Sequence, residues 1–310
     1  MDKVIETFVP AEDPEGSERI TIADQPIVIY KPRNNKVAGL TFVVTAANIP
    51  LSKYASIISA LNSADHVVVG FFVNVINPPL SNHRIKAERI PMIFHELKDD
   101  FKVNSYDIVG HSVGGKIALL VAALYDEEHL VRNITALDPV DQSPVEFTNT
   151  VTKPSAVTKT TKKGRTNLSL ESSRADITLT FTDSGYFIGK KHNAREIQKN
   201  NPSAKIVLHR NSCHMVYCDD GGLLSWKALM GRGSSSDRNK VVREQTLQLI
   251  KDRIMQSSVT GNASGAVKSK VGKARKSISN KMKEAKEMKE EAQSKGKAFA
   301  GAAQAIKVMG

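Results

Sequence analysis

The sequence has little cysteine and lacks any long apolar run. Cys213 and Cys218 are its two cysteines among 310 residues, which is too few for a disulfide framework and favours a reducing compartment. No stretch approaches the roughly 18 consecutive apolar residues that a membrane-spanning helix needs. Residues 1–19 are rich in Asp and Glu and contain no apolar segment, so we expect neither a secretory signal nor an arginine-rich transit peptide.

The basic balance of the chain is confined mainly to its last part. The net charge is +12, and residues 259–310 hold 12 Lys and Arg against 4 Glu, a charge of +8. The remaining 258 residues therefore carry only +4. Because the positive charge is not spread over the body, we do not expect a nucleic-acid-binding protein.

The strongest local motif is residues 110–114, which read Gly-His-Ser-Val-Gly. A short apolar run, residues 106–109, precedes it, and an apolar segment with helical period, residues 113–124, follows. A strand, a tight turn and a helix in this order are the context of a Gly-x-Ser-x-Gly nucleophile elbow. The glycines remove side chains that would clash in the turn. Ser112 is therefore the candidate nucleophile.

Two alternatives exist for this stretch. Residues 110–116 also spell Gly-x-x-x-x-Gly-Lys, the start of a phosphate-binding loop, but Ile117 stands where that motif has a magnesium-binding Ser or Thr. The other alternative is a glycine-rich turn with a purely structural serine.

Strand and helix patterns alternate along residues 1–258, which predicts one α/β domain with a mostly parallel, doubly wound sheet. Residues 142–176 are rich in Ser, Thr and Lys and interrupt this alternation, either as a lid over the site or as a solvated loop. Pro91 is expected to interrupt the helix predicted over residues 84–101. Strands are predicted at residues 20–22, 27–30, 40–45, 66–73, 132–137, 177–182 and 205–209, and helices at 53–61 and 238–255.

A serine nucleophile needs a base, and the base needs a carboxylate to fix its tautomer. In this fold class the residues follow the order Ser, Asp or Glu, His. His214 lies in the loop after the last predicted strand, where the base is expected. Asp138 and Asp183 each follow a predicted strand, and position alone does not choose between them.

The amide of Val113, in the first turn of the helix, is predicted to stabilise an oxyanion. The second donor is expected from the loop 45–51, which follows an internal strand. Ala47 is the candidate there, because small residues allow a substrate carbonyl to approach.

Three blocks of the sequence resemble the landmark motifs of the chlorophyllases, α/β hydrolases that cleave the phytol ester of chlorophyll. They are Gly-His-Ser-Val-Gly-Gly-Lys at 110–116, Ala-Leu-Asp-Pro-Val-Asp at 136–141, and Cys-His-Met at 213–215 followed by Asp219-Asp220. The resemblance spans roughly residues 20–255. It implies an α/β-hydrolase fold, with Ser112 as nucleophile, Asp138 as acid and His214 as base.

The resemblance further implies hydrolysis of chlorophyll to chlorophyllide and phytol, an apolar small-molecule ester substrate, and no metal or organic cofactor. Three positions depart from the family pattern. Val113 stands where arginine is usual, Thr45-Ala46 where His-Gly is usual, and Val216 where an acidic residue is usual. These departures keep two alternatives open: a broader esterase or lipase acting on acyl lipids, and a non-catalytic lipid- or pigment-binding protein.

Cys213, His214, Cys218 and Asp219 are also close together in sequence. A zinc site would need a further pair of ligands, which the sequence does not supply, so we interpret Cys213 as a small residue packed beside the base.

Residues 259–310 place apolar or small side chains at steps of three and four, with lysine on the other faces. This predicts either an amphipathic helix on an anionic membrane or a largely disordered, solvated tail. We expect an intracellular protein, cytoplasmic or plastid-associated, that contacts membranes peripherally through this segment.

Overall fold

The computed structural model describes residues 17–74, 83–141, 147, 168–183, 193–219 and 236–261. The chain divides into two units, Met1–Ser258 and Val259–Gly310. Apart from the last residues of one helix, the second unit lies outside the described residues, and so does the predicted amphipathic tail. Most of the predicted lid at 142–176 also lies outside them.

Within the described residues, eight strands form one sheet in the order β1-β2-β4-β3-β5-β6-β7-β8. The hairpin β1–β2 joins β4 in antiparallel fashion, and every pair from β4 to β8 is parallel, as the sequence predicted. The strands are β1 Ser17–Ile22, β2 Gln25–Tyr30, β3 Gly39–Val44, β4 His66–Phe71, β5 Tyr106–His111, β6 Val131–Leu137, β7 Asp176–Thr182 and β8 Lys205–His209.

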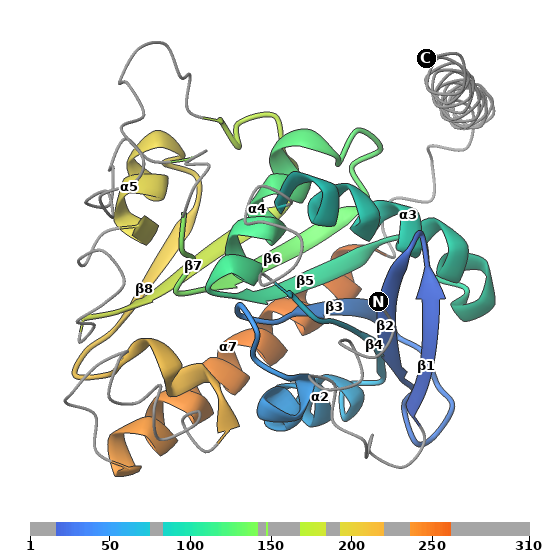
Figure 1. Cartoon of the computed structure of the whole chain (residues 1–310), viewed down its shortest axis with the longest axis horizontal. Coiled ribbons are helices and arrows are strands. Elements are labelled where there is room, and N and C mark those ends of the chain that lie inside the picture. Colours follow the sequence, from blue (N-terminus) through green and yellow to red (C-terminus); the bar gives the residue numbers. More distant parts are fainter. Residues whose placement is uncertain are drawn as a thin grey trace, which may run out of the picture. The chain divides into compact units, whose positions relative to one another are not determined.

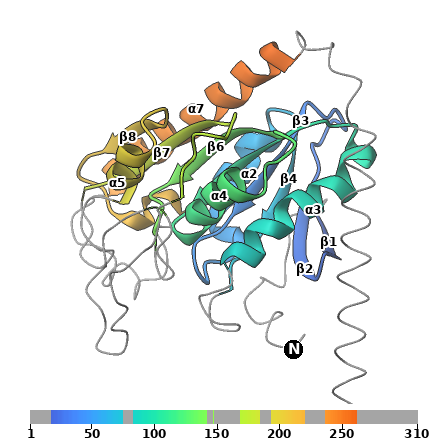
Figure 2. The same cartoon turned by 90° about the horizontal axis from the view of Figure 1, so that it is seen from above.

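Helices cover both faces of the sheet, which makes the architecture doubly wound (Figures 1 and 2). α3, α4 and α5 pack on one face, and α2, η3 and α7 pack on the other. The described helices are η1 Leu51–Tyr54, α2 Ala55–Asn62, α3 His83–Phe101, α4 Val113–Leu124, α5 Asn193–Asn200, η3 His214–Tyr217 and α7 Ser236–Gly261.

The central strand β3 explains why its sequence shows no polar alternation. Leu40, Phe42 and Val44 contribute to the core under α3 and α4, whereas Val43 contributes to the core under α2 and α7. All six residues of β3 are buried. A strand covered on both faces needs apolar residues at successive positions, which is the pattern of a parallel sheet interior.

The prediction that Pro91 interrupts its helix is wrong, because α3 runs unbroken through this proline. Ile90, Ile93, Phe94 and Leu97 of this helix are buried in the core on both sides of it. Their packing outweighs the loss of one backbone hydrogen bond at the proline. Two short helices, α5 and η3, were not predicted from the sequence pattern.

The strands place the candidate functional residues at one edge of the sheet. Ser112 follows β5, Asp138 follows β6 and His214 begins η3 after β8. Because β5 to β8 are parallel, their carboxyl ends share one edge, and the loops after them meet there. Among the described helices, none is both long and apolar enough to cross a membrane.

Candidate active site

Ser112 lies at the turn between β5 and α4, as the motif predicts. Its backbone angles are φ 58° and ψ −119°, a conformation that is uncommon for a residue with a side chain. A side chain at Gly110 would collide with the carbonyl of Gly114, and one at Gly114 would collide with the carbonyls of Val44 and Thr45. The tight turn therefore requires both glycines, and it stores backbone strain at Ser112.

Asp138 follows β6 directly and is held by the neighbouring strand β7. Its backbone has φ 45°, and its amide donates to the carbonyl of Thr180 at 2.9 Å. Its Oδ2 accepts a hydrogen bond from the Thr182 hydroxyl at 2.6 Å and contacts His214 Nδ1 at 2.9 Å. The carboxylate is thus fixed in position from two sides.

His214 presents one ring nitrogen to Asp138 and leaves the other without a partner. A carboxylate only accepts hydrogen bonds, so Nδ1 carries the proton that is donated to Asp138. In the neutral ring Nε2 then bears a lone pair. Nε2 is buried and has no hydrogen-bond partner within the described structure, so Ser112 is not hydrogen-bonded to it here. Such bonds in free enzymes often form only in the substrate complex.

Asp183, the alternative acid, contacts a different group. Its Oδ1 accepts a hydrogen bond from the backbone amide of Asn211 at 2.6 Å. Asp183 therefore fastens the loop that leads from β8 to His214. The structure brings Asp138, and not Asp183, into hydrogen-bond contact with the His214 ring.

The two predicted oxyanion donors lie in segments that pack against each other. Val113 is the first residue of α4, so its amide has no acceptor within the helix. The amides of Ala46 and Asn48 donate to the Tyr54 hydroxyl and to the Val73 carbonyl. Between them, the Ala47 amide has no acceptor among the described residues. Neither amide has an acceptor among the described residues, as a predicted oxyanion donor requires.

Backbone hydrogen bonds connect the serine turn to the segment that carries Asp138. The amide of Ser112 donates to the Leu137 carbonyl at 2.9 Å, and the Ser112 carbonyl accepts from the amide of Val140 at 3.0 Å. The two partners, Leu137 and Val140, lie on either side of Asp138 in the sequence. The separation of Ser112 and Asp138 is therefore set by sheet pairing rather than by flexible loops.

Lys116, the lysine of the alternative phosphate-loop motif, is engaged elsewhere. Its Nζ lies 3.1 Å from Asp141 Oδ1, and both side chains are buried. Asp141 Oδ2 also accepts a hydrogen bond from the amide of Phe147 at 2.8 Å. A buried charge must be paired, and this pair joins α4 to the segment after Asp138.

Cys213 and Cys218 are free, buried thiols on either side of η3. Burial raises the pKa of Cys218 to about 12, so this thiol is protonated at neutral pH. In the described part of the chain, no group of three or more His, Cys, Asp or Glu side chains is placed to hold a metal ion. Asp219 instead accepts hydrogen bonds from the amide and hydroxyl of Ser56.

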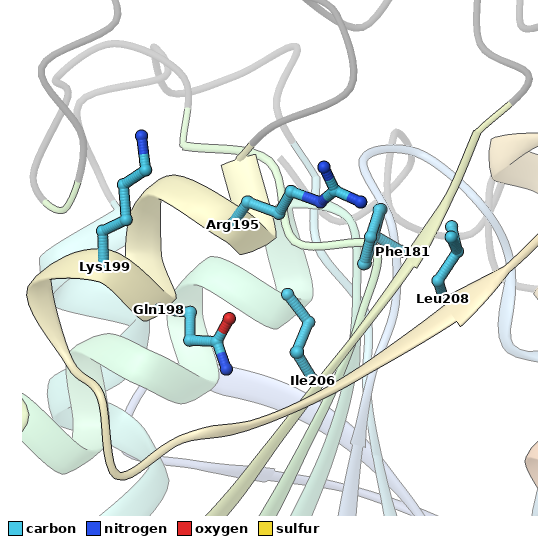
Figure 3. A pocket seen from close by; sticks show the side chains of 6 residues that line it. All are labelled: Phe181, Arg195, Gln198, Lys199, Ile206 and Leu208. Atoms are coloured by element: carbon cyan, nitrogen blue, oxygen red, sulfur yellow. The ribbon is translucent and has the colours of Figure 1, made fainter.

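A cavity of about 290 Å³ lies between α5 and the strands β7 and β8 (Figure 3). Its apolar wall is formed by Phe181, Ile206 and Leu208, and α5 contributes polar and charged side chains. Arg195 lies over the Phe181 ring, with 5.1 Å between the guanidinium carbon and the ring centroid. Ser112, Asp138 and His214 do not line this cavity, so we do not assign the reaction to it.

Sequence reasoning missed several groups around these residues. Thr182 was predicted only as the end of a strand, yet its hydroxyl holds Asp138. Tyr54 and His111 form a buried hydrogen-bonded pair beside His214, although 57 residues separate them in the sequence. For His111 the only available signal was its place in the serine motif.

No protein-family model matches this sequence, and no curated protein matches it either. Solved structures do match. A Pyrococcus furiosus esterase, Pf2001, aligns with a TM-score of 0.52 and 11% identity over 80% of this chain and 96% of its own. Est1E from Butyrivibrio proteoclasticus aligns with a TM-score of 0.50 and 13% identity over 78% and 100%.

An α/β serine hydrolase homologue from Coxiella burnetii aligns with a TM-score of 0.50 and 11% identity, covering 77% of this chain and 99% of its own. At such low identity these matches identify the fold alone. They agree with the parallel sheet, the helices on both faces and the strand–turn–helix at Ser112. The chain therefore has the α/β-hydrolase fold.

Proposed function

We propose that the protein is a carboxylic-ester hydrolase that works through an acyl-enzyme on Ser112. One observation carries the proposal: the hydrogen bond from His214 Nδ1 to Asp138 leaves Nε2 as a buried, unpartnered base at the sheet edge that carries the strained serine turn. This is the arrangement in which an imidazole can take a proton from a serine hydroxyl.

In the proposed reaction His214 Nε2 removes the Ser112 proton while Oγ attacks the ester carbonyl. The amides of Val113 and Ala47 stabilise the oxyanion of the tetrahedral intermediate. Its collapse breaks the bond to the alkoxy group, and His214 gives its proton to the departing alcohol. Water then attacks the acyl-enzyme with His214 again as base, which releases the acid and restores Ser112.

A fluorophosphonate probe tests the nucleophile, because it phosphonylates an activated serine and releases fluoride. We expect the full chain to be labelled and Ser112→Ala to lose the label. Ser212→Ala is a matched control, since Ser212 is also buried and its hydroxyl donates to the His209 carbonyl. Labelling that persists in Ser112→Ala would show that the nucleophile is another residue.

For the substrate we propose the phytol ester of chlorophyll, on the strength of the resemblance of the three sequence blocks to chlorophyllases. The competing substrate class is simple acyl esters and acyl lipids. Purified protein would be given chlorophyll in detergent and, separately, nitrophenyl and glycerol esters. Chlorophyllide formation that disappears in Ser112→Ala supports chlorophyll. Rapid turnover of the simple esters with intact chlorophyll recovered supports the broader esterase.

The same experiment addresses a binding protein without catalysis. That alternative gains weight from the absent Ser112–His214 hydrogen bond and from Thr45-Ala46 in the predicted oxyanion loop. It predicts pigment or lipid binding without turnover, equally strong in wild type and Ser112→Ala. Such a result, together with failure of phosphonate labelling, would overturn the hydrolase proposal.

We further propose that residues 259–310 contact anionic membranes, because their 12 basic and 4 acidic residues accompany an apolar stripe. Deletion of residues 262–310 retains all of α7. It is expected to leave hydrolysis of a water-soluble ester unchanged and to abolish salt-sensitive binding to phosphatidylserine vesicles. Full-length protein that ignores such vesicles at low salt would contradict the proposal.

A further inference from the structure

We propose that Tyr54 and His111 are positioning residues that hold the predicted oxyanion loop and the predicted base in place beside Ser112. This inference rests on the ester-hydrolase function proposed above. It concerns three segments that are distant in sequence: the loop after β3, the end of β5, and η3.

A continuous chain of hydrogen bonds joins these segments. The amide of Ala46 donates to the Tyr54 hydroxyl at 2.9 Å. The same hydroxyl contacts His111 Nδ1 at 2.9 Å, and His111 Nε2 contacts the carbonyl oxygen of His214 at 3.0 Å. All four residues are buried, so water does not compete for these groups.

The groups at the two ends of this series of hydrogen bonds determine which atom is the donor in each bond. The Ala46 amide can only donate, and the His214 carbonyl can only accept. His111 must therefore carry its proton on Nε2 and accept at Nδ1, and the Tyr54 hydroxyl must donate to Nδ1. One tautomer of His111 satisfies these partners, and the buried Cys218 thiol also lies 3.8 Å from Nδ1.

The His111 ring is also enclosed by aromatic rings. Its centroid lies 4.7 Å from that of His214, with 38° between the planes. Tyr54 and Tyr217 approach it edge-on at 5.9 Å and 5.4 Å. Burial and the neighbouring His214 lower the pKa of His111 well below 6.5. A neutral ring is what the chain requires, since Nδ1 must accept.

A second set of hydrogen bonds joins the end of η3 to the junction of η1 and α2. Asp219, just after η3, accepts hydrogen bonds from the Ser56 amide at 2.8 Å and from the Ser56 hydroxyl at 2.6 Å. Ser56 is two residues from Tyr54, at the junction of η1 and α2. This junction therefore anchors η3 at both ends, once through His111 and once through Asp219.

Misplacing either segment would weaken the reaction, because the amide of Ala47 and the ring of His214 act through short, directed hydrogen bonds. Tyr54→Phe removes the hydroxyl that receives the Ala46 amide and donates to His111, with little change of shape. We expect kcat to fall about 10- to 100-fold, as when a supporting hydrogen bond is removed from a functional group, with KM within about twofold.

Tyr217→Phe is the matched control. Tyr217 is equally buried and its ring also contacts His111, but its hydroxyl accepts from Thr180 instead. We expect this variant to keep kcat within about threefold, with a loss of stability similar to that of Tyr54→Phe. Equal kcat in the two variants would overturn the positioning role.

Amide hydrogen exchange of Ala46 tests the contact independently of activity. Exchange should accelerate in Tyr54→Phe and not in Tyr217→Phe, and ¹⁵N shifts should show the His111 proton on Nε2. If wild type neither hydrolyses esters nor takes the phosphonate label, the proposed function fails, and the exchange rates alone then decide whether the chain of bonds holds the loop. Unchanged exchange in Tyr54→Phe would reject it.

His111 offers a second pair of variants in case Tyr54→Phe does not fold. His111→Gln can still donate to the His214 carbonyl, whereas His111→Leu cannot. Partial recovery of kcat in the glutamine variant relative to the leucine variant supports the positioning role. Equal loss in two folded variants, checked by circular dichroism, contradicts it.

Discussion

At the scale of single residues, substitutions at Asp138 and Asp183 test which carboxylate serves His214. Asp138 contacts the His214 ring, and Asp183 contacts a backbone amide two residues after β8. Without a carboxylate, Asn at position 138 can present an N–H to Nδ1 and favour the wrong tautomer. If the proposed ester hydrolysis holds, we expect Asp138→Asn to lower kcat on a nitrophenyl ester by about 10⁴-fold, as the same change does at established serine–histidine–aspartate sites.

Asp183→Asn is the control, with an expected change below about tenfold, because its amide oxygen can still accept from Asn211. The two variants should be compared at one pH with the fraction of folded protein measured for each. A larger loss of kcat in Asp183→Asn than in Asp138→Asn would indicate that Asp183, which follows β7, is the acid.

At the scale of an element, Thr178, Thr180 and Thr182 along strand β7 lie on one face of the sheet, the face that contacts Asp138 and Tyr217. The Thr182 hydroxyl donates to Asp138 and the Thr180 hydroxyl donates to Tyr217. The Thr178 hydroxyl is buried and has no partner within the described structure. A buried hydroxyl without a partner costs stability, so Thr178→Val is expected to raise the free energy of unfolding by about 1 kcal/mol.

Thr180→Val is the matched control on the same strand face. It removes a bonded hydroxyl and should lower the free energy of unfolding by about 1 kcal/mol. Urea denaturation with a shared slope would measure both changes. Destabilisation of equal size in the two variants would mean that the Thr178 hydroxyl has a partner after all, such as an ordered water.

Local sequence signals predicted the elements of this site, whereas their partners came from long-range packing. Gly110, Ser112 and Gly114 mark the turn by their spacing alone. Position after a strand did not choose between Asp138 and Asp183, and only the resemblance of residues 136–141 favoured Asp138; the contact of Asp138 with His214 depends on how β6 and β7 pair. The Tyr54–His111 hydrogen bond could not be predicted from the sequence either, because it joins residues that are 57 positions apart.

Helix boundaries show a related limit of sequence reasoning. Pro91 has a strong intrinsic tendency to interrupt a helix, but the buried apolar side chains around it favour continuation of α3. The helix α5 has few apolar residues and lies against β7 and β8, so its short pattern gave little signal. Tertiary contacts decided both cases.

At the scale of the whole molecule, buried neutral histidines predict loss of stability in mild acid. Burial lowers the pKa of His66 and of His83 from 6.5 to about 4. Between pH 6.5 and about 4 the unfolded chain therefore binds protons that the folded chain rejects. The contribution of these two histidines is fully present above about pH 6.5 and is lost as the pH drops through this window, by about 1.4 kcal/mol per pH unit for each histidine.

His83→Leu tests this prediction, because both ring nitrogens of His83 lack hydrogen-bond partners within the described structure. Free energies of unfolding from urea titrations between pH 7.5 and 4.5 would be compared. The variant should show a shallower dependence on pH below 6.5, whatever its stability at pH 7.5. An identical slope in wild type and variant would exclude His83 as a source of acid sensitivity.

The strand order has a consequence for how the protein is made. From β6 onward each strand pairs with the one that precedes it in the chain, in the sequence β5, β6, β7, β8. As the polypeptide leaves the ribosome, the sheet can therefore grow outward one strand at a time on a surface that already exists. His214 emerges about 100 residues after Ser112 and follows the last strand. A nascent or truncated chain that ends before η3 thus holds the serine turn without His214, and the proposed chemistry begins only when synthesis of the domain is nearly complete.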